Sequence, residues 1–413
     1  MSLPRLWVIS ELYYPEETST GYFITKIAEG LAKDFDVQAV CGQPSYSERG
    51  IRAPRHERHA EVEIHRLRST HFDKDRLLLR ALNLVSFTIA VAFFLAFRLR
   101  RSDQLLVVTN PPTVPFICGW LARLRGCRST LLVHDIYPEV LAATNVMRGG
   151  APYRVLQVAF DHSFRLFDQV VVLGRDMLDV VGKKLGKHAD RMVLIPNWGD
   201  VEEVRPIPAG QNRFLGEHQL AGKAVIQFSG NLGRTHDVEL FVETAQALAD
   251  VPDLKFLAVG YGGKSSVVSE ASNDDAGNLL KLPRQPRDRL AEMLNASTAT
   301  MISFVDGMYG ISVPSRMYNV MAAGRPIIAV AHPRSELALV VAEENAGWVI
   351  DRSQARTDLP ALVRHLATAE GKAEADARGA AARRAAETKY TLGAVIERFR
   401  CILQRNDAPR RTN

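Results

Sequence analysis

Short apolar runs alternate with amphipathic segments along the first half of the chain. Residues 5–10 form the first apolar run, and in the segment 21–33 the large apolar side chains recur at helical spacing. The first pattern predicts a strand buried on both faces of a parallel sheet, and the second predicts a helix that covers the sheet. Further buried strands are predicted at residues 37–41, 105–109, 129–134, 169–173 and 193–196. This alternation is typical of a doubly wound sheet.

The alternation stops and then restarts in the middle of the chain. Residues 197–210 are polar and rich in proline and glycine, a composition that marks a connection between domains. Beyond them, strands are predicted at residues 224–228, 255–260, 279–282, 298–304 and 326–331. Two such halves predict an α/β protein with two Rossmann-like doubly wound domains facing an interdomain cleft, with ligands at the C-terminal ends of the strands.

The domain boundaries follow from these patterns. We expect an N-terminal domain over residues 1–198 and a C-terminal domain over residues 199–390. An amphipathic helix at residues 391–405 is expected to pack back toward the N-terminal domain, and the polar tail 406–413 is expected to be disordered. A length of 413 residues suits two cores better than one.

Charge and cysteine content indicate the partners and the compartment. The net charge is +6, with the basic excess concentrated in residues 49–101, which favours anionic partners such as phosphates, anionic lipid or nucleic acid. The N-terminus lacks the long apolar run of a secretory signal. The four cysteines lie far apart and lack metal-ligand spacing, which indicates a reducing, cytoplasmic setting.

One uncharged segment, residues 81–97, suggests contact with a membrane. Its 17 residues fall short of the roughly 20 that span a bilayer. The arginines that flank it are Arg76, Arg80, Arg98, Arg100 and Arg101. Three interpretations of the predicted helix 77–101 remain open: a buried core helix, a helix lying in the cytoplasmic leaflet with its arginines on anionic headgroups, and a spanning helix.

A glycine-containing segment of the second half is the first candidate phosphate site. Gly230-Asn231-Leu232-Gly233-Arg234 joins a predicted strand to a predicted helix. Glycine lets the backbone approach a phosphate, the helix N-terminus attracts the anion, and the Arg234 guanidinium can add a bidentate contact. An ordinary tight turn is the alternative, because the segment is neither a P-loop nor a dinucleotide fingerprint.

Pro314-Ser315-Arg316 is the second candidate phosphate site. Pro314 fixes the backbone at a helix start, and Ser315 can cap the free N–H groups there. Arg316 adds a positive charge where the helix dipole is already positive. Because this segment belongs to a separate strand–helix unit of the same half, Arg234 and Arg316 can converge on one diphosphate. A helix start with a solvated arginine is the alternative.

His134-Asp135 is the candidate polar pair of the first half. It follows the apolar run 129–133, where a predicted strand exits toward the predicted cleft. A histidine and a carboxylate in this place can orient a sugar hydroxyl or act as a base. A turn in which the aspartate caps a helix is the alternative.

No metal site is predicted. Asp34 and Asp36, and likewise Asp73 and Asp75, have the spacing of an Asp-x-Asp metal motif but lie in polar surface connections. We interpret them as solvated carboxylates. No cluster of histidine, cysteine and acidic residues has the spacing of metal ligands.

Short motifs follow one another over nearly the whole chain. They are Tyr13-Tyr14-Pro15-Glu16, Asn110-Pro111-Pro112, His134-Asp135-Ile136-Tyr137-Pro138-Glu139, Ile195-Pro196-Asn197-Trp198, residues 229–234, Leu282-Pro283-Arg284-Gln285-Pro286, residues 313–316 and Ala322-Ala323-Gly324-Arg325-Pro326. In order and spacing they resemble retaining glycosyltransferase family 4, whose architecture is GT-B. The most similar subgroup contains bacterial enzymes of colanic acid, capsule and O-antigen assembly, which elongate lipid-linked sugars.

The resemblance implies roles for the residues that match. Gly233 and Arg234 resemble the donor-phosphate loop, and Asp135 resembles an acceptor-side aspartate. Ser315-Arg316 resembles the family's Pro-Ser-Lys segment, with arginine in place of lysine. The expected sites are, for catalysis, His134 and Asp135; for the donor diphosphate, Gly230, Asn231, Gly233, Arg234, Ser315 and Arg316; for the nucleoside or sugar, Tyr261, Gly262, Tyr318 and Asn319; and on the acceptor side, Gly21 and Glu139.

The sequence also departs from the family pattern. Ile311 and Asn319 stand where many members carry two glutamates, and Asn319 can still hydrogen-bond a hydroxyl but without charge. Asn231 and His236 stand where many members carry an arginine and a lysine. Arg234 and Arg316 would then have to neutralise the diphosphate.

The resemblance implies a cytoplasmic enzyme associated peripherally with the inner face of the cell membrane. It would transfer a UDP-linked hexose or N-acetylhexosamine, rather than a GDP-linked sugar, to a polyprenyl-diphosphate-linked saccharide, with retention of configuration. An anionic membrane surface is an expected partner, whereas a metal, another cofactor and nucleic acid are not. Two alternatives are a nucleotide-sugar epimerase of GT-B fold and a non-catalytic sugar-nucleotide-binding membrane scaffold.

Overall fold

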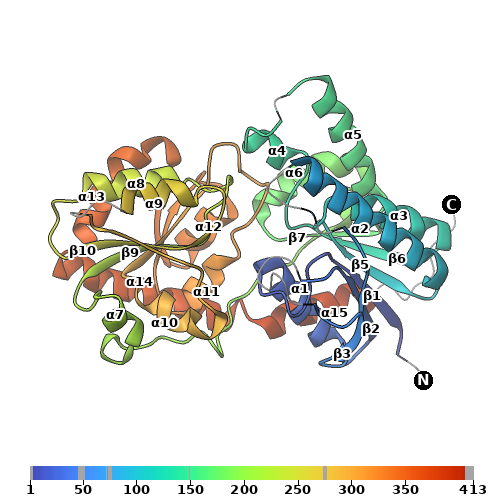
Figure 1. Cartoon of the computed structure of the whole chain (residues 1–413), viewed down its shortest axis with the longest axis horizontal. Coiled ribbons are helices and arrows are strands. Elements are labelled where there is room, and N and C mark those ends of the chain that lie inside the picture. The colour runs from blue at the N-terminus through green and yellow to red at the C-terminus, as the bar shows by residue number, and fades with distance from the viewer. Residues whose placement is uncertain are drawn as a thin grey trace. The chain divides into compact units, whose positions relative to one another are not determined.

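The chain forms two compact units. The computed structural model describes residues 3–44, 52–70, 72, 77–147, 149–272 and 277–404. Unit 1 comprises residues 1–141, 147–196 and 393–413, and unit 2 comprises residues 142–146 and 197–392. Each unit is built around one sheet (Figure 1). The tail predicted to be disordered, 406–413, lies outside the described residues, as do Asp73 and Asp75.

The sheet of unit 1 has eight strands in the order β3-β4-β2-β1-β5-β6-β7-β8. All neighbours are parallel except the antiparallel pair β3–β4. The central strands are the apolar runs seen in the sequence, and they are buried because helices cover both faces of the sheet. The strands are β1 (Arg5–Ile9), β2 (Asp36–Cys41), β3 (His56–His59), β4 (Val62–Arg66), β5 (Gln104–Val108), β6 (Arg128–Leu132), β7 (Gln169–Val172) and β8 (Met192–Leu194).

Helices cover the sheet of unit 1 on both faces, with α1 and α15 on one face and α2 and α3 on the other (Figure 1). Helix α1 begins where the Thr18 hydroxyl accepts a hydrogen bond from the Gly21 backbone N–H, which caps the helix. The helices are α1 (Ser19–Leu31), α2 (Leu77–Arg98), α3 (Val114–Arg125), α4 (Glu139–Ala143), α5 (Ala151–Arg165), α6 (Arg175–Leu185), the 3-10 helix η1 (Gly186–Arg191) and α15 (Leu392–Gln404).

Helix α2 is divided lengthwise into a core face and an exposed face. Phe87, Val91 and Leu95 are buried, and the Asn83 side chain exchanges two hydrogen bonds with the Phe72 backbone, at 2.9 Å each. The apolar side chains of the opposite face, at helical spacing, are exposed: Leu78, Leu82, Val85, Ile89, Phe93 and Phe97. Within the described residues, only Ala81–Arg98 is long and apolar enough to cross a membrane. Because this second face is exposed, α2 is not a fully buried core helix.

The sheet of unit 2 has six parallel strands in the order β11-β10-β9-β12-β13-β14. Its order reverses between β9 and β12, so the connections that leave these two strands run to opposite sides. The strands are β9 (Ala224–Asn231), β10 (Leu254–Tyr261), β11 (Leu279–Leu282), β12 (Ala299–Ser303), β13 (Ile327–Val330) and β14 (Gly347–Ile350).

Unit 2 is also covered on both faces, with α8, α9 and α13 on one side of the sheet and α11 and α14 on the other (Figure 1). The α-helices are α7 (Arg213–Glu217), α8 (Val238–Ala247), α9 (Ser265–Ser272), α10 (Leu290–Asn295), α11 (Arg316–Ala322), α12 (Glu336–Glu343), α13 (Ala355–Leu366) and α14 (Ala369–Thr388). The short 3-10 helices are η2 (Ala209–Gln211), η3 (Arg287–Arg289) and η4 (Arg352–Gln354). The Arg383 guanidinium of α14 donates to the Ala322 carbonyl at 2.6 Å, which fixes α14 to the end of α11.

Helix α15 returns to unit 1 and packs on α1. The Arg400 guanidinium pairs with the Asp34 carboxylate at 2.8 Å. A Cβ atom at Gly30 of α1 would lie 2.6 Å from two side-chain atoms of Ile396. Glycine at this position therefore lets the two helices approach closely.

We expect Gly30→Ala to destabilise the protein by about 2 kcal/mol, because the added methyl overpacks the α1–α15 contact. Urea unfolding measures the change. Gly393→Ala is the matched control, since no atom lies within 4 Å of a Cβ there, and it should shift stability by no more than about 1 kcal/mol. In the double variant, Ile396→Ala should remove part of the stability loss caused by Gly30→Ala, because it makes room for the added methyl. If the stability losses of the two single variants simply add in the double variant, this packing is contradicted.

Candidate functional site

The predicted donor residues lie at the C-terminal end of the unit 2 sheet, where the strand order reverses. Strand β9 ends in Gly230-Asn231, and its neighbour β10 ends in Gly260-Tyr261, in register with it. Strand β12, on the other side of β9, leads through a loop to Arg316 at the start of α11. The reversal of strand order is the usual ligand-binding place in doubly wound sheets.

Glycines bring the ends of β9 and β10 into contact. Gly230 has a φ of 116° and Gly260 a φ of 148°, both in the region that favours glycine. A Cβ atom at Gly260 would lie 1.9 Å from the Gly230 carbonyl oxygen, and one at Gly262 would lie 2.5 Å from the Leu232 carbonyl oxygen. The Leu232 N–H donates to the Tyr261 carbonyl at 2.8 Å. The two predicted donor loops therefore form one continuous backbone surface.

Arg316 is anchored beside this surface. Its Nη1 donates to the Ser229 carbonyl at 2.6 Å, and its Nη2 hydrogen-bonds Nε2 of His236. The guanidinium lies over the Phe228 ring, 5.3 Å from the ring centroid, and 3.4 Å from the position of a Cβ at Gly230. Burial lowers the pKa of Arg316 to about 10, so the side chain is still charged at neutral pH.

His236 links the end of β12 to Arg316. Its Nδ1 lies 3.2 Å from the Ser303 carbonyl oxygen, which can only accept, so Nδ1 carries the proton and Nε2 accepts from Arg316. Burial, and after it the Arg316 charge, hold the pKa of His236 well below its usual value. The ring is therefore neutral at neutral pH. The sequence marked His236 only as a departure from the family pattern, because its partners are distant in the chain.

Arg234 contrasts with Arg316. Its side chain is exposed, and no hydrogen bond or ion pair holds it within the residues that the structure describes. Asn231 is exposed as well, and Gly233 is buried beneath it, since a Cβ there would lie 2.9 Å from Nδ2 of Asn231. Of the two arginines predicted to bind the diphosphate, one is thus fixed by protein groups and the other has no protein partner among the described residues.

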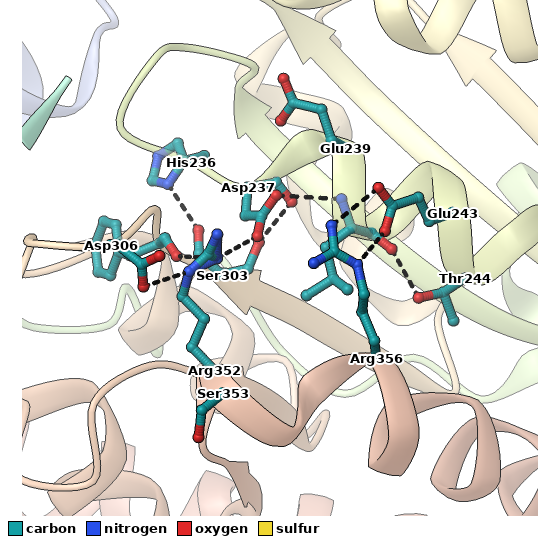
Figure 2. Close-up of polar contacts among 12 residues, drawn as sticks. His236, Asp237, Glu239, Glu243, Thr244, Ser303, Asp306, Arg352, Ser353 and Arg356 are labelled. Carbon is teal, nitrogen blue, oxygen red and sulfur yellow. Dashed lines mark hydrogen bonds and ion pairs between the residues drawn. The ribbon is translucent and has the colours of Figure 1, made fainter. Parts of the chain in front are cut away.

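The N-terminus of α8 is occupied by a carboxylate. Asp237 caps the helix by accepting from the Leu240 N–H at 3.2 Å, and it pairs with Arg352 (Figure 2). Arg352 also pairs with Asp306 at 2.7 Å, and the Ser303 hydroxyl donates to the Asp237 carbonyl at 3.0 Å. The prediction that this helix end attracts a phosphate is therefore weakened, because an anion already lies there. The network instead fixes the segment that holds His236.

Ser315 and Tyr318 are two further residues predicted for the donor side. Ser315 precedes α11, but its side chain makes no capping hydrogen bond, so the predicted cap is wrong. Tyr318 is fully buried and packs against Tyr390, with 5.2 Å between ring centroids, which makes it a core residue.

Asn319 is hydrogen-bonded to the segment with which the chain enters unit 2. Its Oδ1 accepts from the Asp200 N–H at 3.0 Å. The Arg287 guanidinium pairs with the Asp200 carboxylate at 2.9 Å, so both sides of Asp200 are tied to unit 2. The bond from the Asp200 N–H uses one of the two lone pairs of Oδ1, so the predicted hydrogen bond to a ligand hydroxyl would involve the second lone pair or the Asn319 amide nitrogen.

In unit 1, His134 and Asp135 follow β6 and are positioned by β5. The Thr109 hydroxyl oxygen accepts from the backbone N–H of His134 at 3.0 Å and of Asp135 at 3.4 Å. Burial lowers the pKa of His134 to about 4, and its buried Nε2 makes no hydrogen bond within the described residues. A base that works at neutral pH needs a pKa near 7. His134 is therefore poorly suited to remove a proton from a hydroxyl at neutral pH.

Glu139 is held in a buried ion-pair cluster. Nζ of Lys184, which is 3% exposed, lies 2.7 Å from the Glu139 carboxylate and 2.9 Å from the Asp161 carboxylate. This cluster joins α4, α5 and α6 and gives Glu139 a structural partner that the sequence did not reveal. Gly21 lies in the first turn of α1, where a Cβ would be 2.7 Å from the Glu16 carbonyl oxygen.

The expected absence of a metal stays a prediction. Within residues 3–44, 52–70, 72, 77–147, 149–272 and 277–404, no group of three or more histidine, cysteine, aspartate or glutamate side chains is placed to hold a metal ion. Asp34 pairs with Arg400, and Asp36 pairs with Arg5 at 2.8 Å. These two carboxylates are thus engaged in ion pairs at the surface.

Comparison with known sequences gives a consistent family. Residues 20–198 match the family described as "Glycosyl transferase 4-like domain". WbjE of Pseudomonas aeruginosa, named as a glycosyltransferase, is 30% identical over 349 residues, which cover 84% of this chain and 85% of that protein. WcaI of Escherichia coli K12, named as a colanic acid biosynthesis glycosyl transferase, is 26% identical over 341 residues, which cover 79% of this chain and 83% of that protein.

Comparison with solved structures gives the fold. Sucrose-phosphate synthase from Thermosynechococcus elongatus superposes with a TM-score of 0.72 at 16% identity, covering 97% of this chain and 98% of that one. Alr3699/HepE from Anabaena, in complex with UDP-glucose, superposes with a TM-score of 0.71 at 12% identity, covering 97% and 99%. At such identities the likeness shows the fold, which is GT-B.

We expect the stability of the protein to fall as the pH drops from 7 to 5, in part because of His134. The unfolded chain takes up a proton at this histidine below about pH 6.5, whereas the folded protein, with a His134 pKa of about 4, does not. His134→Gln should therefore lose about 2 kcal/mol less than the wild type over this interval, measured by denaturant unfolding.

Between pH 7 and pH 9 the His134→Gln variant and the wild type should change in parallel, because His134 is neutral in both the folded and the unfolded chain there. Equal losses from pH 7 to pH 5 in the two proteins would show that His134 is protonated in the folded state.

Proposed function

Because the chain belongs to the glycosyltransferases that contain a glycosyl transferase 4-like domain, and acts in polysaccharide biosynthesis, we propose that it uses a nucleotide-diphosphate sugar as its donor. The proposed donor is a UDP-linked hexose or N-acetylhexosamine. The proposed acceptor is a lipid-linked saccharide of the cell surface, and the proposed outcome is retention of configuration.

The observation that carries the donor proposal is the pairing of an anchored and a free arginine at the reversal of strand order in unit 2. Arg316 is fixed to the Ser229 carbonyl and to His236 next to the glycines that end β9 and β10, and Arg234 is free within the described residues. A diphosphate needs backbone approach and concentrated positive charge, and both are present here. The fold is also that of HepE, which has been solved with UDP-glucose.

In the proposed reaction the acceptor hydroxyl attacks the anomeric carbon from the side that the diphosphate leaves. The bond from the anomeric carbon to the leaving phosphate oxygen breaks, and that oxygen takes the hydroxyl proton. Arg316 and Arg234 stabilise the negative charge that develops on the diphosphate, a role that a metal ion fills in other sugar transferases. On unit 1, the pair His134 and Asp135 orients the acceptor hydroxyl.

The relatives favour a transferase over both alternatives raised from the sequence. WbjE and WcaI are named as glycosyltransferases, and neither is named as an epimerase or a scaffold. The departures at Ile311 and Asn319 bear on donor binding and leave the arginines in place.

We further propose that unit 1 lies on an anionic membrane surface through a face formed by α2, α3 and α5, which we call the three-helix face. Helix α2 packs on α3, where the Thr88 and Thr113 hydroxyls lie 2.6 Å apart, and α3 packs on α5, where Trp120 lies 5.7 Å from His162. Its exposed apolar side chains are Leu78, Leu82, Val85, Ile89, Phe93 and Phe97 of α2, Trp120 and Leu124 of α3, and Val155 and Val158 of α5. Apolar exposure on this scale marks an interaction surface.

The charge of the three-helix face fits anionic lipid. Helices α2 and α3 contain no acidic residue, and the single one in α5, Asp161, is paired with Lys184. Exposed arginines on these helices and just after α2 are Arg98, Arg100, Arg101, Arg123, Arg125, Arg154 and Arg165. Because the other face of α2 belongs to the core, the helix would lie along the membrane surface and would not cross the bilayer.

The enzyme proposal is tested by incubating the protein with a panel of UDP- and GDP-linked sugars and a short-chain polyprenyl-diphosphate-linked sugar. We expect UDP release that depends on the acceptor. Arg316→Ala should lower kcat/KM by about two to three orders of magnitude, because a charge that stabilises the leaving diphosphate is lost. Arg234→Ala should lower it by about tenfold.

The matched control is Arg205→Ala, which should retain activity. It removes an exposed arginine of the same unit that is paired with Glu202. Interconversion of donor sugars without an acceptor would favour the epimerase. Bound nucleotide without any turnover would favour the scaffold.

For the membrane proposal, we expect Ile89, Phe93 and Phe97 changed together to serine to release the protein from vesicles rich in anionic lipid, because these exposed side chains lose apolar contact with the bilayer. Co-sedimentation measures binding. Leu3→Ser is the control, since Leu3 is exposed but lies outside the three-helix face. Undiminished binding by the folded triple variant would overturn the proposal.

A further inference from the structure

Arg316 depends on a small set of protein groups for its direction. Two of its N–H groups are used by the Ser229 carbonyl and by His236, and the Phe228 ring lies beneath the guanidinium. A guanidinium has five N–H donors in one plane, so three remain for a ligand. The two protein acceptors fix the plane of the guanidinium, and that plane determines the direction of the three remaining N–H groups.

Of these two acceptors, only the His236 imidazole is a side chain. The ring is 7% exposed and stacks on Phe304, with 5.2 Å between centroids and 24° between planes. Its Nδ1 donates to the Ser303 carbonyl at 3.2 Å, and its Nε2 accepts from Arg316. The ring therefore cannot turn without losing the hydrogen bonds of both nitrogens. The backbone carbonyl of His236 accepts from Lys264 Nζ at 2.8 Å, which holds the main chain there.

We infer that His236 is a positioning residue, which accepts a hydrogen bond from Arg316 and so orients the guanidinium toward the donor diphosphate. This inference rests on the proposed function, in which Arg316 binds that diphosphate. In this role His236 acts through Arg316 and needs no contact of its own with the substrate. Because one ring nitrogen is bonded to the Ser303 carbonyl at the end of β12 and the other to Arg316 at the start of α11, the ring fixes the position of Arg316 relative to β12.

The charges around the ring agree with this role. The cations Arg316 and Lys264 both lower the pKa of His236, after burial, and the Asp237 carboxylate next in the chain is turned to Arg352 and to the start of α8. A neutral ring can offer its Nε2 lone pair to a cation, whereas a protonated ring has no acceptor and would repel the guanidinium. The positioning role therefore depends on a hydrogen-bond acceptor at the place of Nε2.

Two substitutions separate the two ring nitrogens. A glutamine side chain reaches the place of Nε2 and keeps an acceptor for Arg316, whereas an asparagine reaches the place of Nδ1 and keeps only the donor to Ser303. We expect His236→Asn to weaken UDP binding by about tenfold, because the loss of one hydrogen bond to a charged group costs about 1.5 kcal/mol. His236→Gln should stay within about threefold of the wild type. Isothermal titration calorimetry with UDP measures both.

The same pair in an Arg316→Ala background distinguishes positioning from simple packing. There, His236→Asn and His236→Gln should bind UDP equally, because the residue they act through is gone. With donor and acceptor both present, His236→Asn should raise KM for the donor more than it lowers kcat. If His236→Asn does not fold, His236→Leu, which keeps the apolar contact with Phe304, replaces it with the same expectation.

Equal UDP binding by wild type, His236→Asn and His236→Gln would overturn the positioning role while leaving the proposed function intact. So would an undiminished effect of His236→Asn in the Arg316→Ala background. If the wild type itself binds no UDP and no other nucleoside diphosphate, the proposed function fails first, and the inference fails with it.

Discussion

The donor site depends on the contact between two backbones at the ends of β9 and β10. A side chain at Gly260 would overlap the Gly230 carbonyl oxygen, at 1.9 Å, so only glycine allows the two strands to stay paired to their last residues. Because the pairing continues that far, the segments after both strands leave the sheet together. Arg316 packs against Gly230, 3.4 Å from the position that a Cβ atom would take there. The close backbone contact and the fixed charge of Arg316 therefore lie at the same end of the sheet.

Much of the fold is predictable from the sequence, because buried parallel strands are continuous apolar runs. Strands β1, β2 and β5 to β13 were predicted within a few residues, whereas the hairpin of β3 and β4 and the edge strand β14 were not. The sequence His-Glu-Arg-His of β3 is polar because this strand lies at the sheet edge and is half exposed. The apolar segment of α2 was recognised, but which of its faces belongs to the core is decided by neighbours distant in the chain, such as Trp7 packing on Phe94.

Those parts of the candidate site that consist of short contiguous sequence segments were predictable. The glycines and the two arginines are recognised in short segments of sequence, and the structure places Arg316 beside Gly230. Contacts between distant segments were not predictable. The histidine that holds Arg316 hydrogen-bonds a carbonyl 67 positions further along the chain. Tyr318 packs against Tyr390, and no local sequence pattern predicts this contact.

The return of α15 to unit 1 makes that unit discontinuous along the chain. Residues 393–404 are synthesised after the whole of unit 2, yet their side chains cover α1, and Arg400 provides the partner of Asp34. Unit 2 can therefore be completed on the ribosome while α1 still has an uncovered apolar side. The half of the protein that is translated first is thus finished last, and chaperones that recognise exposed apolar helices would meet it in that interval.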